Sequence, residues 1–248
     1  RKVAERHTVA LSGECADEVF GGYPWFERSE LLEADTFPWC PDLEFRRAVV
    51  KPELWESLQV EDYVQARYQQ SLAEMPTLPG EALWERRRRE VGWLSLNWFM
   101  STLLDRKDRM SMAAGLEVRV PFCDHHLVEY VWNIPWAMKA MNGQRKQVLR
   151  DAAEGLLPEE LLRRPKSPYP KTHDPLYEQL VRARLLTILD DRDAPIHSLV
   201  DEKALRAGLL SDAGDYGKPW FGQLMAGPQM LAYLIQINEW MSRYQLTV

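Results

Sequence analysis

The sequence predicts a mostly α-helical chain with one short β-strand, Thr8 to Leu11, and three observations lead to that prediction. Apolar residues recur at helical spacing between breaks that contain Pro and Gly. The short apolar run from Val9 to Leu11 ends at Ser12-Gly13, where the periodicity becomes helical. The 248 residues are 46% hydrophobic, which is enough for one large core. We therefore expect a folded, helix-rich body.

The expected elements follow one another between clear stop signals. After a first helix and a region of short helices, the amphipathic segment 60–72 is closed by Pro76 and by Pro79-Gly80. One or two long helices over 81–112 are apolar on most faces, so we expect them to be buried. The rest, in order, are an extended segment at 115–122, a helix over 124–134 capped by Asp124, helices over 146–154, 176–189 and 228–244, and an irregular loop over 166–174.

Composition excludes several classes of function. A net charge of −6, with both signs spread along the chain, argues against nucleic acid as a partner. The arginine run 86–89 is expected to form a solvated helix turn or to pair with nearby acids. Cys15, Cys40 and Cys123 are spaced for neither a disulfide framework nor a zinc site. The sequence has no apolar run of about eighteen residues and no leader, so we expect a soluble, cytoplasmic protein without a membrane partner.

Three carboxylates crowd the turn that follows the strand. Glu14, Asp17 and Glu18 fall at the start of the first helix, where the helix dipole favours negative charge. A well-capped helix start would explain them. A nucleotide site would explain them too, because backbone N–H groups at Ser12-Gly13 could approach phosphate and Asp17 could bind it through Mg²⁺. Glu14 could then face the reacting carbon as a base or as a charge stabiliser. The spacing alone leaves both interpretations open.

Three ordered blocks of sequence carry a family resemblance. Residues 12–23 read SGECADEVFGGY, and residues 104–112 and 115–122 read LDRKDRMSM and GLEVRVPF. A third block reads KQVLR at 146–150, then LPE at 157–159 and RPK at 164–166. In this order and spacing the blocks resemble the synthetase domain of the glutamine-hydrolysing asparagine synthetases.

The resemblance implies a fold and a place in a longer protein. The family's domain is α/β, of the adenine nucleotide alpha hydrolase-like or PP-loop type, so the strand at residues 8–11 is expected to be a remnant of a parallel sheet. Residues 1–248 correspond to the C-terminal portion of that single domain. The family's N-terminal glutaminase domain and pyrophosphate loop have no counterpart in this sequence. By itself, the chain is expected to be inactive. An unpaired sheet edge and an exposed apolar face are expected to make it less soluble or to let it self-associate.

The implied reaction has two steps and assigns roles to the matched residues. ATP adenylates the side-chain carboxylate of aspartate, and ammonia derived from glutamine then displaces AMP from β-aspartyl-AMP to give asparagine. ATP and Mg²⁺ are the implied cofactors, and the resemblance allows a homodimer of the parent protein. The implied site comprises Glu14 and Lys146 as catalytic residues, Asp17 as the Mg²⁺ ligand, and Ser12, Gly13, Arg150 and Lys166 as nucleotide-binding residues.

Several alternatives remain open. Lys146 and Arg150 share one helix face, which solvent alone would also explain. The loop 166–173 covers the site or is a surface connection. Cys15 stands where the family commonly has Gly, and a positive φ there would cost about 1 kcal/mol. The alternative functions are an amide-forming synthetase for another carboxylate and a non-catalytic helical interaction domain. A structural ion-pair network is as plausible as a site role for Asp105, Asp108, Arg109, Glu117 and Arg119.

Overall fold

The computed structural model describes residues 1–140, 143–165, 174–210 and 219–248. The chain forms two compact units. Unit 1 comprises residues 1–38 and 68–167, and unit 2 comprises residues 39–67 and 168–248. The boundary between residues 67 and 68 falls inside one helix, α5 (Val60–Ala73).

Unit 1 contains a two-stranded parallel sheet. Strand β1 (Val9–Leu11) pairs with β2 (Glu117–Arg119) in the register Val9 with Glu117 and Leu11 with Arg119. Two flanking bonds extend the ladder, from Ser12 N to Arg119 O at 2.9 Å and from Glu117 N to Thr8 O at 2.9 Å. The strand predicted at residues 8–11 and the extended segment within 115–122 are both confirmed. Because more than a hundred residues separate them, their pairing was beyond reach of the local pattern.

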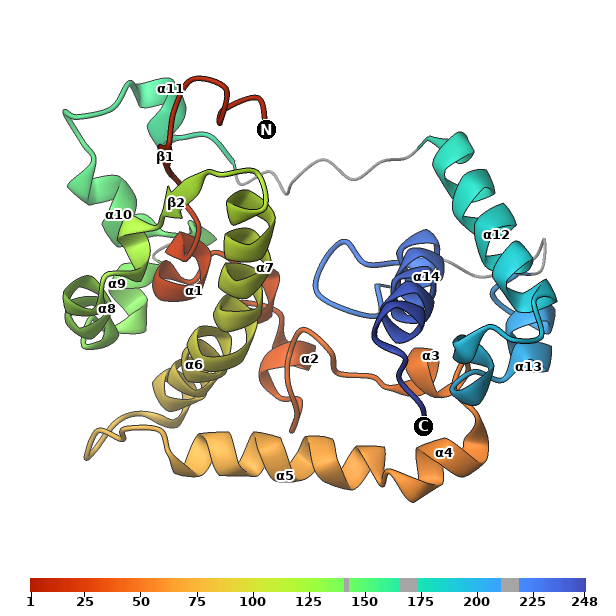
Figure 1. Ribbon diagram of the computed structural model, residues 1–248. Coiled ribbons are helices and arrows are strands. Elements are labelled where there is room, and N and C mark those ends of the chain that lie inside the picture. The colour runs from red at the N-terminus through yellow and green to blue at the C-terminus, as the bar shows by residue number, and fades with distance from the viewer. Residues whose placement is uncertain (141–142, 166–173, 211–218) are drawn as a thin grey trace. The chain divides into compact units, whose positions relative to one another are not determined.

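The helices of unit 1 surround this sheet (Figure 1). Helix α1 follows β1 after a short turn, and α7 packs beside β2. In chain order the helical elements are α1 (Ala16–Phe20), η1 (Pro24–Phe26), α2 (Ser29–Leu32), α6 (Leu83–Leu94), η2 (Ser95–Met100), α7 (Ser101–Met112), η3 (Pro121–Cys123), α8 (His125–Trp132), α9 (Trp136–Lys139), α10 (Gln147–Ala152) and α11 (Glu159–Leu162).

A single helical run spans residues 83–112, as α6, the π-helical turn η2 and α7. Val91, Leu94 and Phe99 in its first two parts are buried. In α7, by contrast, no residue of 101–112 is buried. The expectation that the whole run is buried on most faces is therefore wrong for α7, because its charged stretch 105–109 places polar side chains on most of its circumference.

A small apolar cluster holds α1 in place. Ala16, Val19 and Phe20 are buried against Val131 of α8, and the ring of Phe20 meets Phe122 edge-on at 6.0 Å. Helix α8 begins as predicted at Asp124, whose side chain accepts hydrogen bonds from His126 N and Leu127 N. With α1 fixed by packing, the turn between β1 and α1 has a defined position.

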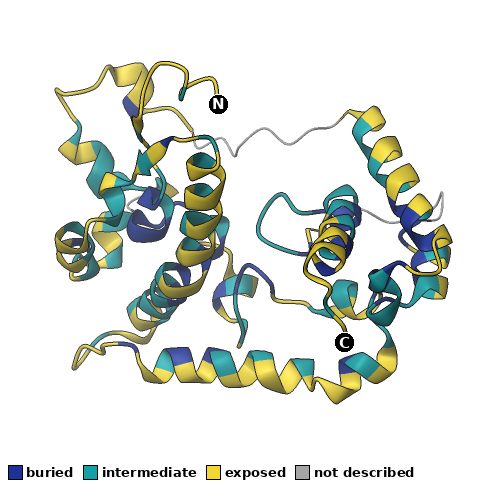
Figure 2. Ribbon diagram, viewed as in Figure 1, coloured by how far each residue is buried: buried dark blue, intermediate teal, exposed yellow. Residues whose placement is uncertain are grey.

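In its described residues, unit 2 is a mostly helical body around an apolar core. Leu185, Ile196, Leu205 and Leu231 are fully buried there, and Figure 2 shows buried residues along both of its long helices. The backbone also forms an isolated antiparallel bridge between Val50 and Val200. Its helical elements are α3 (Glu44–Arg47), α4 (Pro52–Ser57), the first part of α5, α12 (Pro175–Asp190), η5 (Pro195–Ser198), α13 (Glu202–Ala207) and α14 (Gly227–Tyr244).

Helix dominates the described residues, as predicted, and the two short strands pair in parallel. Helices α12 and α14 match the predicted segments 176–189 and 228–244 to within one residue at each end. In the described part of the chain, no helix combines the length and the apolar character needed to cross a bilayer.

Candidate functional site

The turn from β1 to α1 carries an unusual backbone conformation. Cys15, the residue before α1, has φ of 74° and lies in the left-handed region. The positive φ considered for this position is thus present, and a non-glycine residue is strained there by about 1 kcal/mol. The Cys15 thiol is buried, and burial together with Cys123 raises its pKa. A thiol that stays protonated is a poor nucleophile, so Cys15 is a packing residue.

Glu14 points one oxygen at a lysine and leaves the other unbonded. Its Oε1 lies 3.1 Å from Lys107 Nζ and 3.8 Å from Arg106 Nη2. Only 12% of the Glu14 side chain is exposed. Its Oε2 is buried and has no hydrogen-bond partner among the residues that the structure describes. A buried carboxylate oxygen without a donor is costly in a finished core, and it is typical of a site that receives a ligand or a proton.

Ser12 belongs to the same group of contacts. Its Oγ accepts a 2.7 Å hydrogen bond from Lys107 Nζ and a 3.3 Å hydrogen bond from the backbone N of Glu14. Lys107 was absent from the predicted site. It lies in the second matched block, but the alternating charges of that block give no sign of which one faces β1. Only the pairing of β1 with β2, beside which α7 packs, brings Lys107 to the turn.

Asp17 and Lys146 form a second ion pair at the site. Lys146 Nζ lies 2.8 Å from Asp17 Oδ1, and each side chain is about one quarter exposed. The pair rests directly on the backbone of Gly22, where an added Cβ would come within 1.8 Å of Asp17 Oδ1 and 2.5 Å of Lys146 Cε. A side chain at position 22 would therefore displace the ends of both Asp17 and Lys146. The structure brings Asp17 of the first block together with Lys146 of the third.

Glu18, the third carboxylate of the turn, has a different environment. It is 3% exposed, and Tyr23 donates a 2.8 Å hydrogen bond to its Oε1. Tyr23 in turn stacks on Trp25 at 4.2 Å, and burial next to the Glu18 charge raises the pKa of the Tyr23 phenol. Glu18 is thus a buried acid held by Tyr23, and no side chain forms a capping hydrogen bond at the start of α1 in the described structure.

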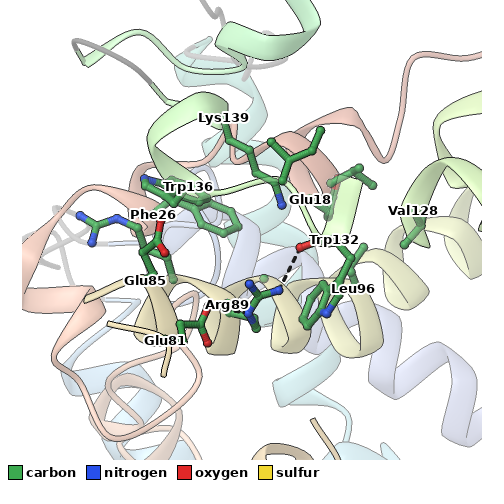
Figure 3. A pocket seen from close by; sticks show the side chains of 14 residues that line it. Glu18, Phe26, Glu81, Glu85, Arg89, Leu96, Val128, Trp132, Trp136 and Lys139 are labelled. Atoms are coloured by element: carbon green, nitrogen blue, oxygen red, sulfur yellow. Dashed lines mark hydrogen bonds and ion pairs between the residues drawn. The ribbon is translucent and has the colours of Figure 1, made fainter. Parts of the chain in front are cut away.

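A cavity of about 40 Å³ lies next to Glu18 (Figure 3). Trp132, Trp136, Arg89 and Lys139 also line it. Burial, with a smaller contribution from Arg89, lowers the pKa of Lys139 to about 8. Sites for ligands of drug or cofactor size have volumes of about 300–1,000 Å³. A nucleotide therefore cannot occupy this cavity.

Three of the four arginines in the run 86–89 form ion pairs with acids, as one of the two interpretations proposed, and Arg88 donates to the carbonyl of Trp84. Arg86 and Arg87 bind Glu90 at 3.3 and 2.7 Å. Arg89 is not solvated, because it forms a buried ion pair with Glu81 at 2.7 Å and donates to the carbonyl of Trp132 at 2.9 Å. The run ties α6 to its neighbours in unit 1.

Arg150 is engaged with backbone. Its guanidinium donates to the carbonyls of Arg145 at 3.0 Å and Arg164 at 3.1 Å, and also to the carbonyl of Leu162. These contacts connect α10 with the segment around α11. They support a structural role, and nucleotide binding by Arg150 stays a prediction. Lys166 and the loop 166–173 lie outside the described residues, so their predicted roles stay predictions too.

The charged residues of the second block mostly pair with one another. Arg109 Nε lies 2.8 Å from Asp105 Oδ1, and Arg119 Nε lies 2.8 Å from Glu117 Oε1. More than half of each of these side chains is exposed. Exposed ion pairs contribute little, about 0–1 kcal/mol. The geometry favours the ion-pair interpretation for these four residues.

Comparison with known proteins identifies the family. The family model "Asparagine synthase" matches residues 1–242. Asparagine synthetase (glutamine-hydrolyzing) 3 of Bacillus subtilis strain 168 is 48% identical over 248 residues, covering 100% of this chain and 40% of that protein. Asparagine synthetase (glutamine-hydrolyzing) 1 of the same strain is 32% identical over 201 residues, covering 68% and 32%. The golden hamster (Mesocricetus auratus) asparagine synthetase (glutamine-hydrolyzing) is 45% identical over 67 residues, covering 26% and 12%.

The chain thus spans about 40% of the length of the first of these relatives and 32% of the second. Its match to the family model extends over nearly the whole sequence and includes all three blocks. This chain belongs to the asparagine synthase family.

Proposed function

We propose that this chain is the C-terminal portion of the synthetase domain of a longer enzyme that forms asparagine from aspartate, ATP and ammonia. Family membership supports the proposal, and so does the name of the relative that is 48% identical over the whole chain. The decisive structural observation is Glu14, a nearly buried carboxylate with one oxygen held by Lys107 and the other without a donor among the described side chains. Ammonia would come from glutamine through a glutaminase domain outside this chain.

In the first proposed step, a side-chain oxygen of aspartate attacks the α-phosphorus of ATP. The new O–P bond forms as the bond to pyrophosphate breaks, and pyrophosphate leaves with the electron pair. Negative charge accumulates on the leaving group, so a cation beside it lowers the barrier. Lys146 is suited to this role, because it lies at the start of α10 next to the turn that follows β1. The Gly13 backbone would contact the nucleotide, whereas the Ser12 N–H is already bonded to Arg119 O in β2, and contact by Ser12 stays a prediction.

Mg²⁺ could be held at this site only if the substrate phosphates also supplied ligands. Among the described residues, no three His, Cys, Asp or Glu side chains gather as a metal site. Mg²⁺ in nucleotide sites is commonly held by one or two carboxylates and by substrate phosphates, so a lone Asp17 is sufficient. Bound there, Mg²⁺ would supply positive charge to the phosphates. Gly22 leaves the room for Asp17 and Lys146 to meet the same anion.

In the second proposed step, ammonia attacks the acyl carbon of β-aspartyl-AMP. A C–N bond forms, the C–O bond to the phosphate breaks, and AMP leaves with the electron pair. The attacking nitrogen must lose one proton to become an amide. Glu14 Oε2 is the acceptor we assign, because it is the carboxylate oxygen at the turn that lacks a donor within the described structure.

The finer features of the proposal follow the family. The parallel pairing of β1 and β2 is consistent with an adenine nucleotide alpha hydrolase-like sheet to which other parts of the parent would add strands. Cys15, Cys40 and Cys123 are all free thiols, which is consistent with the cytoplasm. A homodimer of the parent stays a prediction.

The test uses the full-length protein that carries this chain, with ATP, Mg²⁺, aspartate and ammonia. We expect aspartate-dependent pyrophosphate release and asparagine formation in the wild type. Glu14→Gln removes the proton acceptor and keeps the shape, so we expect asparagine formation to fall by about 10²-fold or more. Asp105→Asn, which changes a 62% exposed carboxylate on α7, is the matched control and should stay near wild type.

Other results would select another function. Pyrophosphate release with a different carboxylate from a substrate panel, but not with aspartate, would favour another amide-forming synthetase. No release with any carboxylate would favour the non-catalytic helical interaction domain.

A further inference from the structure

Lys107 of α7 bonds to two residues of the turn between β1 and α1, Ser12 and Glu14. Its ammonium group lies 2.7 Å from Ser12 Oγ and 3.1 Å from Glu14 Oε1. The side chain is 22% exposed, so solvent screens these contacts only partly. The neighbouring Arg106 reaches the same carboxylate at 3.8 Å with a side chain that is 57% exposed. Lys107 is therefore the principal cation that acts on Glu14.

Lys107 contacts one of the two carboxylate oxygens of Glu14, and the choice of oxygen bears on proton transfer in the amide-forming step. Lys107 binds Oε1 and leaves Oε2, which is buried, without a partner in the described structure. One charge-assisted bond to one oxygen fixes how the carboxylate is turned, and it leaves the other oxygen available as an acceptor. The second bond from the same ammonium holds Ser12, which is anchored to β2 through its backbone N. A single group thus sets the spacing between Ser12 and Glu14.

We propose that Lys107 is a positioning residue for the amide-forming step, holding Glu14 with Oε2 turned toward the acyl carbon. This inference rests on the proposed function and goes beyond it, because it assigns a role to a residue that does not touch the reacting atoms. In the amide-forming step, the proton leaves the attacking nitrogen for Glu14 Oε2, and Lys107 keeps its own proton throughout. Adenylation, in which Glu14 takes no proton, does not need Lys107 in this way.

A purely structural ion pair is the competing explanation, and the two explanations predict different results. A structural pair would affect both steps together through stability. A positioning residue would affect the second step selectively. Misplacing a reacting group by about 1 Å can cost about 10²-fold in rate, so the selective effect is measurable.

The experiment compares Lys107→Met, Lys107→Arg and wild type in the full-length protein. Adenylation is measured alone as aspartate-dependent exchange of labelled pyrophosphate into ATP, at saturating ATP. The second step is measured as asparagine formation at saturating ammonia. Lys203→Met, which makes the same change at an exposed lysine in unit 2, is the matched control. Thermal midpoints are recorded for every variant.

We expect Lys107→Met to lower kcat for asparagine formation by about 10-fold to 100-fold, with pyrophosphate exchange within about threefold of wild type. Lys107→Arg keeps the charge and should recover most of kcat. If pyrophosphate exchange, kcat and the thermal midpoint of Lys107→Met all fell together, the contact would be a structural pair and the inference would be overturned. An unchanged kcat in Lys107→Met would also overturn it. Wild-type protein that forms no asparagine would overturn the proposed function and this inference together.

Discussion

The two units of this chain differ in whether they bury charge, although both carry exposed ion pairs. Unit 1 buries charge: the Arg89–Glu81 pair is 9% and 5% exposed, and Glu14 and Glu18 lie almost out of solvent. Unit 2 has an apolar core and keeps ion pairs such as Arg184–Glu239 at its surface, with both side chains more than half exposed.

Buried charge is stable only when it is paired and hydrogen-bonded, so unit 1 gives up stability that unit 2 keeps. In unit 1 the lone carboxylate oxygen of Glu14 coincides with the matched motif. We therefore propose that unit 1 carries the chemistry and that unit 2 is a scaffold, and substitutions in the two units should separate stability from activity.

The largest stability effect is expected in unit 2. Leu231 is fully buried in the core between α12 and α14, so Leu231→Ala should lower the free energy of unfolding by about 2–5 kcal/mol. Leu180→Ala, at a 61% exposed position on α12, is the control and should change it by less than about 0.5 kcal/mol. Denaturant unfolding measures both. If the folded fraction of Leu231→Ala also lost adenylation, unit 2 would be more than a scaffold.

Features of the fold and of the site could be predicted from the sequence when the residues involved lie close together along the chain. The local signals were reliable: the apolar run at Val9 to Leu11 became β1, and Asp124 capped α8. Contacts between distant segments were not visible. Nothing in the sequence around Arg150 shows that its guanidinium donates to the Leu162 carbonyl, and nucleotide binding by Arg150 stays a prediction. Lys107 was missed for the same reason, since its partners Ser12 and Glu14 are more than ninety residues away.

Lys139 should destabilise unit 1 at neutral pH. Its pKa, lowered to about 8 from 10.5, means that the unfolded chain binds more protons than the folded chain between these values. Wild-type stability from this group is therefore lowest below about pH 8 and rises toward pH 10.5. Lys139→Met removes the buried charge, and at pH 7 it should stabilise the protein by about 1–3 kcal/mol, an upper range because the site is partly open to solvent.

The advantage of Lys139→Met should shrink as the pH is raised from 7 to 9.5, and unfolding measured across that range, with Lys203→Met as the exposed control, checks it. A constant difference between Lys139→Met and wild type would show that packing, not charge, sets the effect.

A smaller effect is expected from Gly22→Ala in unit 1. The added Cβ would overlap Asp17 Oδ1 and Lys146 Cε, so both side chains must move from the positions they share. We expect the apparent KM values for Mg²⁺ and ATP to rise. We also expect the rate of adenylation to fall by about 10-fold, which corresponds to about 1.4 kcal/mol. Gly92→Ala in α6 offers a comparison, because an added Cβ there comes no closer than 4.0 Å to its nearest neighbours. Equal effects at the two positions would argue against the close approach at Gly22 as the cause.

The smallest effect concerns the strained residue at the entrance to α1. Cys15→Ala and Cys15→Gly both remove the buried sulfur, but only Gly adopts φ of 74° without strain. The left-handed conformation costs a residue with a Cβ about 1–2 kcal/mol. Glycine has greater conformational entropy in the unfolded chain, which lowers the stability of the Gly variant by about 0.4–1 kcal/mol. The Gly variant should therefore be more stable than the Ala variant by about 1 kcal/mol, the reverse of their order inside a helix.

The difference in unfolding free energy between the two Cys15 variants reports the cost of the backbone conformation alone, because both variants lose the contact with Cys123. An Ala variant as stable as the Gly variant would mean that the turn relaxes once the sulfur is gone. In that case the positive φ of Cys15 would be imposed by packing of the thiol and not by the path of the chain from β1 into α1. The Glu14 carboxylate would then be expected to shift as well, and asparagine formation by the Ala variant would report it.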